Sequence, residues 1–372
     1  KSRTNALSKC EHEDAADYAW MMDADDKING NPDLNFIETT GSSSYSLRIV
    51  RGEGFTWWRN QIFKLGDGWH YVGILHEYAD VTDRENKHSM QLPGDYSLEA
   101  RTEGARNVGI TPRDKYLKDA AVLESCLTNS DDPNYDPDND RYHFYLGQSY
   151  FDAGEHEKAQ EWYKKRAARG GWDEEVYYSV YRIAICSGIL GEPWEKTLMH
   201  FLMAWDYRPH RAEALHQISR VFRLNGKPKL AAIYAKMGKE IEYPHFDILF
   251  ISGSVYEWQM LDEYASTAFY VGDLDGGLAA VEELLNNRKL PKEEIERVKN
   301  NQTHYKAAIK ERTEFYNKQQ AERDKFMAEQ ESKNEEVKAK RKLAQDSKLG
   351  KKEKAKKTKQ RQAQRKARKS RV

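Results

Sequence analysis

Two patterns of apolar and polar residues divide the chain into an N-terminal region and a helical region. In residues 1–110 short β-like runs alternate with Gly-rich turns. The apolar run 18–22 stops at Asp23, as a buried strand does where it meets a polar loop. Apolar residues alternate with more polar ones over 45–49, and 71–75 form another apolar run. Strands mixed with such turns predict an α/β domain.

From Thr111 to about Tyr316 the apolar residues recur at helical spacing. Thr111 is a predicted N-cap, and Pro112 suits the first position of a helix. Further on, bulky and small residues recur in the order His143, Leu146, Gly147, Tyr150, Gly154, Ala159 and Tyr163. This order matches a tetratricopeptide repeat (TPR), a helix pair of about 34 residues in which small residues let the helices approach. We therefore predict TPR-like repeats over 111–316, with an irregular helical bundle as the alternative.

Further repeat units match less completely. Phe201, Ala204 and Pro209 fit the second half of the next unit, after a small insertion near Gly188–Pro193. The third unit is indicated by Leu215, Phe222, Gly226 and Ala231 and closes at Pro244, and the fourth by Leu261, Ala265, Ala268 and Gly272, closing at Pro291.

The charges are balanced in total but not along the chain. Lys and Arg number 60, and Asp and Glu also number 60. Residues 333–372 hold 18 basic and 4 acidic residues, a net charge of +14, so residues 1–332 carry −14. No proline follows Pro291 and no aromatic residue follows Phe326. We predict that the tail, residues 317–372, is disordered or a solvated helix, and that it is attracted to phosphate groups or an anionic membrane surface without sequence specificity.

Other classes of protein are excluded by composition. No apolar run approaches the ~20 residues that a membrane-spanning helix needs. The three cysteines lie far apart with no CxxC spacing, which excludes a zinc ribbon or a disulfide framework. They favour a reducing compartment, so we expect a cytoplasmic protein. The chain opens on Lys1 without a leader, and we expect it to be cut from a longer protein.

The acidic segment that follows the first apolar run can carry chemistry. Asp23 and Asp25 are separated by one residue, which places both carboxylates on the same side of an extended chain. Carboxylates at the end of a buried strand can hold a hard divalent cation together with the oxygens of a substrate diphosphate. A solvated turn or a helix cap is the alternative interpretation of the same pattern.

Three further segments stand in a definite order around the acidic motif. The segment from Arg3 to Leu7 precedes it, and the segments Trp57–Phe63 and Gly68–Tyr78 follow it. This order resembles that of family 2 glycosyltransferases with the GT-A fold, in which similar segments lie at similar distances from the acidic motif. Relatives in this family often carry TPRs directly behind the catalytic domain, and the resemblance covers roughly residues 1–290. A GT-A domain begins with strand–helix units that hold the nucleotide. The resemblance therefore implies that this chain is N-terminally truncated.

The resemblance also implies an activity and roles for particular residues. It implies metal-dependent, inverting transfer of a sugar from a nucleotide-sugar donor to an unknown glycan, lipid or protein acceptor. Asp23 and Asp25 would bind the donor, with Asp25 holding Mg²⁺ or Mn²⁺. Glu77 would be the general base, His76 a further metal ligand or an orienting group, and Arg3 would face the donor phosphates.

Each of these roles has an alternative. Arg3 could be a surface residue, and His76 and Glu77 a surface or capping pair. We expect Trp57, Trp58 and Trp69 to pack in the core, with stacking on sugar or nucleotide rings as the alternative. The repeats would bind the acceptor or a protein partner. The competing hypothesis is a non-catalytic TPR scaffold with a residual acidic motif.

Overall fold

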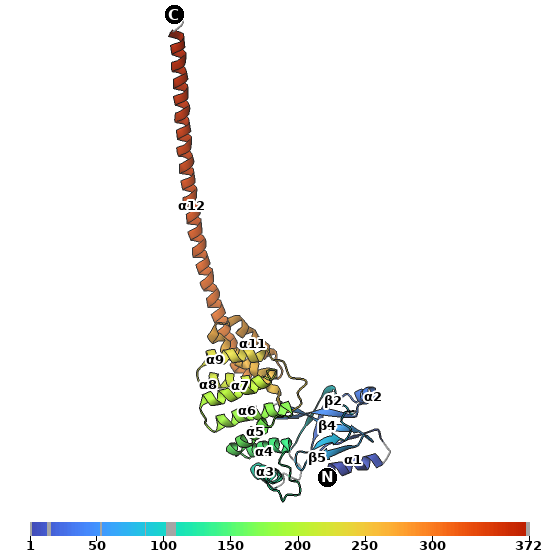
Figure 1. Cartoon of the computed structure of the whole chain (residues 1–372). Helices are drawn as coiled ribbons and strands as arrows, with labels where there is room; N and C mark the ends of the chain where they lie inside the picture. The colour runs from blue at the N-terminus through green and yellow to red at the C-terminus, as the bar shows by residue number, and fades with distance from the viewer. Residues whose placement is uncertain (1, 13–15, 53, 86, 102–108, 370–372) are drawn as a thin grey trace. The chain divides into compact units, whose positions relative to one another are not determined.

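The computed structural model describes residues 2–12, 16–52, 54–85, 87–101 and 109–369. The chain forms two compact units, Lys1–Thr303 and His304–Val372. The first unit contains a sheet with two short helices and a stack of helices, and the second is helical (Figure 1).

The N-terminal part of the first unit is built on a mixed sheet. Its strands are ordered β1-β4-β3-β8-β2; β7 pairs with β3, and a later strand, β9, pairs with β4. The pairs that β3 forms with β7 and β8 are parallel, and the other pairs are antiparallel. The hairpin β5-β6 forms a separate two-stranded sheet. The elements are α1 (Ser2–His12), β1 (Tyr18–Trp20), β2 (Lys27–Pro32), α2 (Asn35–Thr40), β3 (Ser44–Arg51), β4 (Phe55–Lys64), β5 (Trp69–Val72), β6 (Tyr78–Val81), β7 (Ser89–Gln91) and β8 (Gly94–Glu99).

The predicted α/β region is confirmed, with corrections to two strands. Tyr45, Leu47 and Ile49 are 0% exposed on β3, as their alternation predicts. The run 18–22 is not a buried five-residue strand, because β1 ends at Trp20, the last backbone hydrogen bond to β4 comes from the Met21 N–H, and Met22 is 45% exposed. The run 71–75 likewise leaves the strand after Val72, where Gly73 has a φ of 107° that ordinary strand residues do not adopt.

The helical part consists of successive helices that pack against one another (Figure 1). Thr111 caps the first of them as predicted, since its Oγ1 accepts a hydrogen bond from the Asp114 N–H. The helices are α3 (Pro112–Thr128), α4 (Asp140–Asp152), α5 (His156–Ala168), α6 (Asp173–Ile189), α7 (Trp194–Tyr207), α8 (Glu213–Leu224), α9 (Pro228–Lys239), α10 (Met260–Thr267) and α11 (Leu274–Asn286). A π-helical turn, Val255–Gln259, leads into α10.

The packing of α4 and α5 shows why the repeat pattern needs small residues. A Cβ atom on Gly147 of α4 would lie 3.0 Å from Cδ1 of Tyr163 on α5, and Ala159 of α5 is 0% exposed. Gly154 takes a φ of 78° in the turn between the two helices, where a residue with a side chain would be strained. The TPR-like interpretation is therefore confirmed, in preference to an irregular bundle.

The segment after α9 returns to the sheet, which the sequence did not reveal. Strand β9 (Ile251–Ser252) adds to the edge of β4, and the Trp58 N–H donates to the Ile248 carbonyl at 2.8 Å. The Phe250 ring stacks on Phe55 of β4 at 5.3 Å between ring centroids. The sheet and the repeats are thereby joined by both backbone and side-chain contacts.

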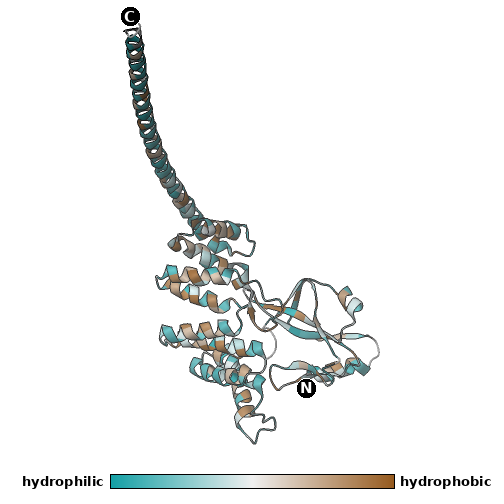
Figure 2. Cartoon of the chain, turned by 45° about the horizontal axis from the view of Figure 1, so that its top comes forward, coloured by the Kyte–Doolittle hydropathy of each residue, from teal (hydrophilic) through white to brown (hydrophobic). Residues whose placement is uncertain are grey.

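The second unit belongs to one long helix, α12 (Ile295–Lys369), which begins in the first unit. It runs without a break across residues 316 and 317, where we placed the start of the tail. From residue 313 to residue 366 every side chain is exposed, and Figure 2 shows this helix as largely hydrophilic. The tail was predicted to be either disordered or a solvated helix, and in the structure it is a solvated helix. Within the described residues, no helix is both long and apolar enough to cross a membrane.

Candidate functional site

Asp23 is the centre of a cluster of charged side chains drawn from separate elements. Arg3 of α1 donates from Nη2 to one carboxylate oxygen of Asp23. Arg59 of β4 donates from Nη1 to the other oxygen at 3.2 Å, and from Nη2 to Asp26 at 3.0 Å. The structure thus brings the predicted residues Arg3 and Asp23 together, with Arg3 bonded to a carboxylate.

The pKa values of Asp23 and Asp26, the two acidic residues that Arg59 contacts, are shifted in opposite directions. Burial alone would raise the pKa of Asp23, but the guanidinium groups of Arg59 and Arg3 outweigh it and the pKa is lowered. Burial raises the pKa of Asp26, and the nearby Asp23 and Asp25 carboxylates reinforce the increase against the effect of Arg59. Asp23 is therefore held as an anion between two cations, while Asp26 is the more easily protonated.

Tyr71 and Glu77 extend this cluster towards the hairpin β5-β6. The Arg3 guanidinium lies 5.7 Å from the centroid of the Tyr71 ring, and Thr4 accepts a hydrogen bond from the Tyr71 N–H at 3.0 Å. Burial raises the pKa of Tyr71, and Arg3 opposes that increase. Glu77 interacts electrostatically with both Arg3 and Tyr71. The predicted donor residue Arg3 and the predicted general base Glu77 therefore belong to one electrostatic environment.

His76 is placed differently from its predicted role beside a metal ion. Its ring stacks on Tyr145 of α4, with 4.0 Å between centroids and 10° between planes. Its φ of 51° lies in the left-handed region, which is uncommon for a residue with a side chain. Such strain is often found at functional positions and persists only when the surroundings hold it. The metal-ligand role of His76 stays a prediction.

Few side chains of this cluster are arranged to bind a divalent cation. Among the residues that the structure describes, no group of three or more His, Cys, Asp or Glu side chains is arranged to hold a metal ion. Asp23 and Asp26 are already bonded to guanidinium groups. A cation at Asp25 would depend on oxygens supplied by a bound ligand such as a diphosphate. Mg²⁺ or Mn²⁺ therefore stays a prediction that the resemblance implies.

Sequence reasoning missed Arg59, Asp26 and Tyr71. Each lies inside a motif segment that was recognised, so only their individual roles were not assigned. The interpretation of Trp69 as a core residue is confirmed, because it is 8% exposed and its ring packs at 5.3 Å from that of Phe63. Its indole N–H also donates to Ser43 at 3.0 Å.

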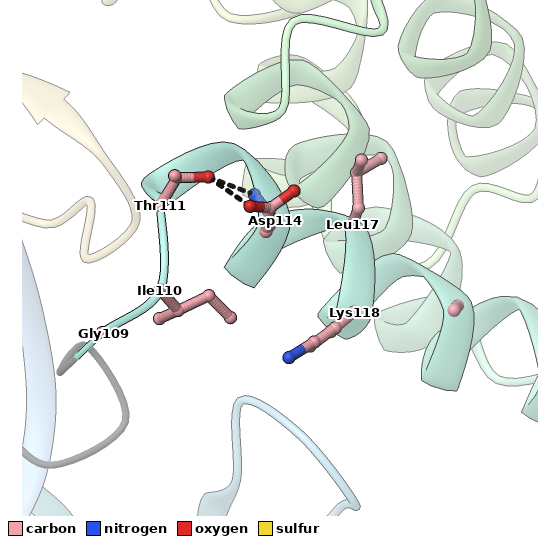
Figure 3. Close-up of a pocket in the computed structure, with 7 residues that line it drawn as sticks. Gly109, Ile110, Thr111, Asp114, Leu117 and Lys118 are labelled. Carbon is pink, nitrogen blue, oxygen red and sulfur yellow. Dashed lines mark hydrogen bonds between the residues drawn. The ribbon is translucent and has the colours of Figure 1, made fainter.

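A separate hollow of about 520 Å³ lies beside the start of α3 (Figure 3). Ile110, Leu117 and Lys118 line it, together with the capping pair Thr111 and Asp114. None of the predicted site residues is among its lining residues, so it plays no part in the site around Asp23.

No protein-family model and no curated protein matches this chain. Several solved structures are similar to part of it. A TPR protein from Thermus thermophilus is 18% identical and the match covers 53% of this chain and 91% of that one, with a TM-score of 0.32. The C-terminal part of a TPR-containing protein from Cytophaga hutchinsonii is 13% identical, with coverages of 54% and 69% and a TM-score of 0.39. MamA is 16% identical, with coverages of 48% and 89% and a TM-score of 0.34.

These likenesses concern fold alone and identify nothing in the α/β part. The TPR-like character of the helical part rests on its own packing, described above for α4 and α5. The first unit is thus an α/β region joined to a TPR-like stack of helices.

Proposed function

We propose that this chain is part of a nucleotide-sugar transferase whose TPR-like repeats hold the acceptor or a protein partner. One observation carries the proposal. Arg3, Asp23 and Glu77 come from three separate stretches, the motif order assigns all three to donor binding or catalysis, and they share one electrostatic environment. Residues of a solvated turn or of unrelated surface pairs have no reason to converge in this way.

The cluster contains two guanidinium groups of the kind that binds phosphate oxygens, each now paired with a carboxylate. Arg3 and Arg59 present guanidinium groups, whose planar geometry matches phosphate oxygens. A divalent cation at Asp25 would neutralise charge that develops on the leaving diphosphate. Glu77 would take the proton from the acceptor hydroxyl as that oxygen attacks the anomeric carbon.

The test is binding and hydrolysis of nucleotide sugars by the complete protein. A panel of UDP-, GDP- and dTDP-sugars is titrated with and without Mn²⁺, and release of the nucleoside diphosphate is measured. We expect Asp25→Ala to abolish the Mn²⁺-dependent hydrolysis while the fold is retained. Asp33→Ala is the matched control, because Asp33 is an exposed aspartate of the same domain outside the cluster. Undiminished turnover by Asp25→Ala would remove Asp25 from the site.

A non-catalytic TPR scaffold is the second candidate. The packed helices favour it, and the similar solved structures fit it better than they fit a transferase. TPR-like stacks expose an extended surface that suits protein partners. If none of the nucleotide sugars binds or is hydrolysed, this second candidate replaces the first.

A further inference from the structure

A second cavity, of about 210 Å³, lies where the repeats meet the edge of the sheet. Aromatic rings form much of its wall: Phe55 comes from β4, Phe250 from the segment before β9, and Tyr178 and Tyr181 from α6. Arg182 of α6 and Ser252 of β9 add polar groups, and the ion pair of Arg211 with Glu213 also lines the cavity. Cavities lined by aromatic rings with a few polar groups are typical of binding sites for small ligands.

Phe250 is held in the cavity wall by a network of buried charges. Its φ of 46° is in the left-handed region, a conformation that needs support from its surroundings. Arg211, which is 1% exposed, donates to the Phe250 carbonyl at 2.9 Å. Glu174 accepts from the backbone N–H groups of Ile248 and Leu249 at 2.8 and 2.7 Å. Burying these charged groups costs free energy, and in return they hold the backbone that carries the Phe250 ring. The network fixes the shape of the cavity before any ligand arrives.

Arg182, which is partly buried, differs from the buried arginines Arg166 and Arg211. Arg166 pairs with Glu175 at 3.0 Å, and Arg211 pairs with Glu213 at 2.7 Å. The Arg182 guanidinium instead lies 3.6 Å from the centroid of the Phe151 ring and 5.3 Å from that of Tyr178.

No carboxylate of the described part of the chain lies within 4.0 Å of the Arg182 guanidinium, and its Nε has no hydrogen-bond partner there. The nearby Tyr163 hydroxyl interacts with the guanidinium, and Asp152 attracts it from a longer range. A cation in this setting favours a ligand that carries a carboxylate.

The strand β4 contributes one residue to the cavity and another to the Asp23 cluster. Phe55 lines the cavity, Arg59 contacts Asp23, and both side chains lie on the same face of the strand because residues two apart share a face. Four strand residues span about 13 Å, a distance that an oligosaccharide bridges.

We propose that this cavity is an acceptor subsite for a sugar ring that carries a carboxylate, such as a uronic acid. The inference rests on the proposed transferase function, which it deepens by naming the class of acceptor. The rings of Phe250 and Tyr178 would pack on the apolar face of the sugar, and Arg182 would bind its carboxylate.

The test is saturation-transfer NMR with the complete protein, using methyl glucuronide as the probe and methyl glucoside as its neutral match. We expect the glucuronide to receive saturation and to bind at least about tenfold more tightly than the glucoside, since one charge-assisted hydrogen bond contributes about 1.4 kcal/mol or more. Arg182→Gln should remove this preference, and Phe250→Leu should weaken the binding of both sugars. Arg220→Gln is the control, because Arg220 is an exposed arginine on helix α8 that does not line the cavity.

Equal binding of the two sugars, no binding of either, or an unchanged preference in Arg182→Gln would overturn the proposal. Far-ultraviolet circular dichroism and melting temperature check that each variant is folded, and Phe250→Leu provides the test if Arg182→Gln is not. Nucleotide-sugar binding is measured separately. Donor binding without glucuronide binding removes this subsite only. Glucuronide binding without donor binding leaves the cavity as a saccharide site and removes the transferase.

Discussion

Arg141 of α4 donates two hydrogen bonds, at 3.0 Å from Nε and 2.8 Å from Nη2, to the backbone carbonyl oxygen of His76. Its guanidinium also lies 4.9 Å from the centroid of the Tyr78 ring and 4.6 Å from that of Tyr145. The loop between β5 and β6, which carries Glu77, is therefore fixed by the first repeat.

Arg141→Ala should loosen this loop and destabilise the first unit. The variant loses two hydrogen bonds from a charged donor, each of which contributes about 1.5–3 kcal/mol. We expect faster amide hydrogen exchange over residues 73–77 and a loss of at least about 1.5 kcal/mol in urea unfolding. Arg113→Ala is the control, because Arg113 is exposed and forms only a surface pair with Glu155, worth about 1 kcal/mol or less. Similar effects of the two variants would mean that Arg141 does not hold the loop.

Glu77→Gln should separate binding from chemistry. Glutamine keeps the size of the side chain but cannot take a proton, so donor binding should stay near normal while transfer falls by about 10²–10⁴-fold. The measurement is release of nucleoside diphosphate, together with the affinity for the nucleotide sugar. Weaker donor binding with little loss of rate would assign Glu77 a structural role or a role at the metal.

Gly147→Ala should be destabilising although alanine favours helices. The new Cβ would lie 3.0 Å from the Tyr163 ring, and overpacking of this kind costs about 1–3 kcal/mol. Gly188→Ala is the matched control, since a Cβ on this helical glycine meets its nearest atom, on Thr197, at an ordinary 3.8 Å. The control should be neutral or more stable by up to about 1 kcal/mol. Thermal unfolding of the two variants decides, and equal stabilities would contradict the close approach of α4 and α5.

His216 should make stability depend on pH between about 6.5 and 4. Burial lowers the pKa of its imidazole to about 4, and its Nδ1 has no hydrogen-bond partner within the described structure. The unfolded chain therefore binds a proton more readily than the folded chain below pH 6.5. Stability is fully present above that pH and falls as the pH drops towards 4, by up to roughly 3 kcal/mol.

Urea unfolding of the natural chain and of His216→Gln across this pH range isolates the contribution of His216. Both proteins share every other residue, so the difference between their stability curves reports on His216 alone. His70→Gln serves as the control because His70 is only partly buried. If the free energies of unfolding of the natural chain and of His216→Gln change in parallel with pH, His216 does not cause the pH dependence.

Removal of residues 333–372 should leave the melting temperature of the remaining chain nearly unchanged. Every side chain described between residues 333 and 366 is exposed, so little packing is lost, although the helical signal should fall. The deletion removes a net charge of +14, and retention on anionic vesicles and on RNA should be lost.

Retention of the intact chain should weaken with salt, because the Debye length falls from about 10 Å at 0.1 M to about 3 Å at 1 M. A control in which the basic residues of 351–361 become Gln keeps the length of the helix and reduces its charge. A distinctly lower melting temperature after truncation would mean that the tail helix is docked. Retention that survives truncation and high salt would place the anion-binding surface elsewhere.

The sequence alone determined the local elements and the residues worth testing. The alternation over 45–49, the cap at Thr111 and the repeat at 143–163 are short-range patterns, in which each residue reports on neighbours a few positions away. The order of motifs, through its resemblance to a glycosyltransferase family, indicated Arg3, Asp23, Asp25, His76 and Glu77 as site residues.

Only the tertiary structure decided which residues meet. Arg59 reaches Asp23 across 36 positions of sequence, Arg141 reaches His76 across 65, and Phe250 reaches Phe55 across a still longer stretch. A local sequence pattern cannot predict such contacts, because an arginine on a strand has the same sequence neighbours whether its guanidinium faces solvent or a carboxylate. The strand β9 was missed for the same reason, since two residues acquire a strand conformation only when a partner strand is beside them.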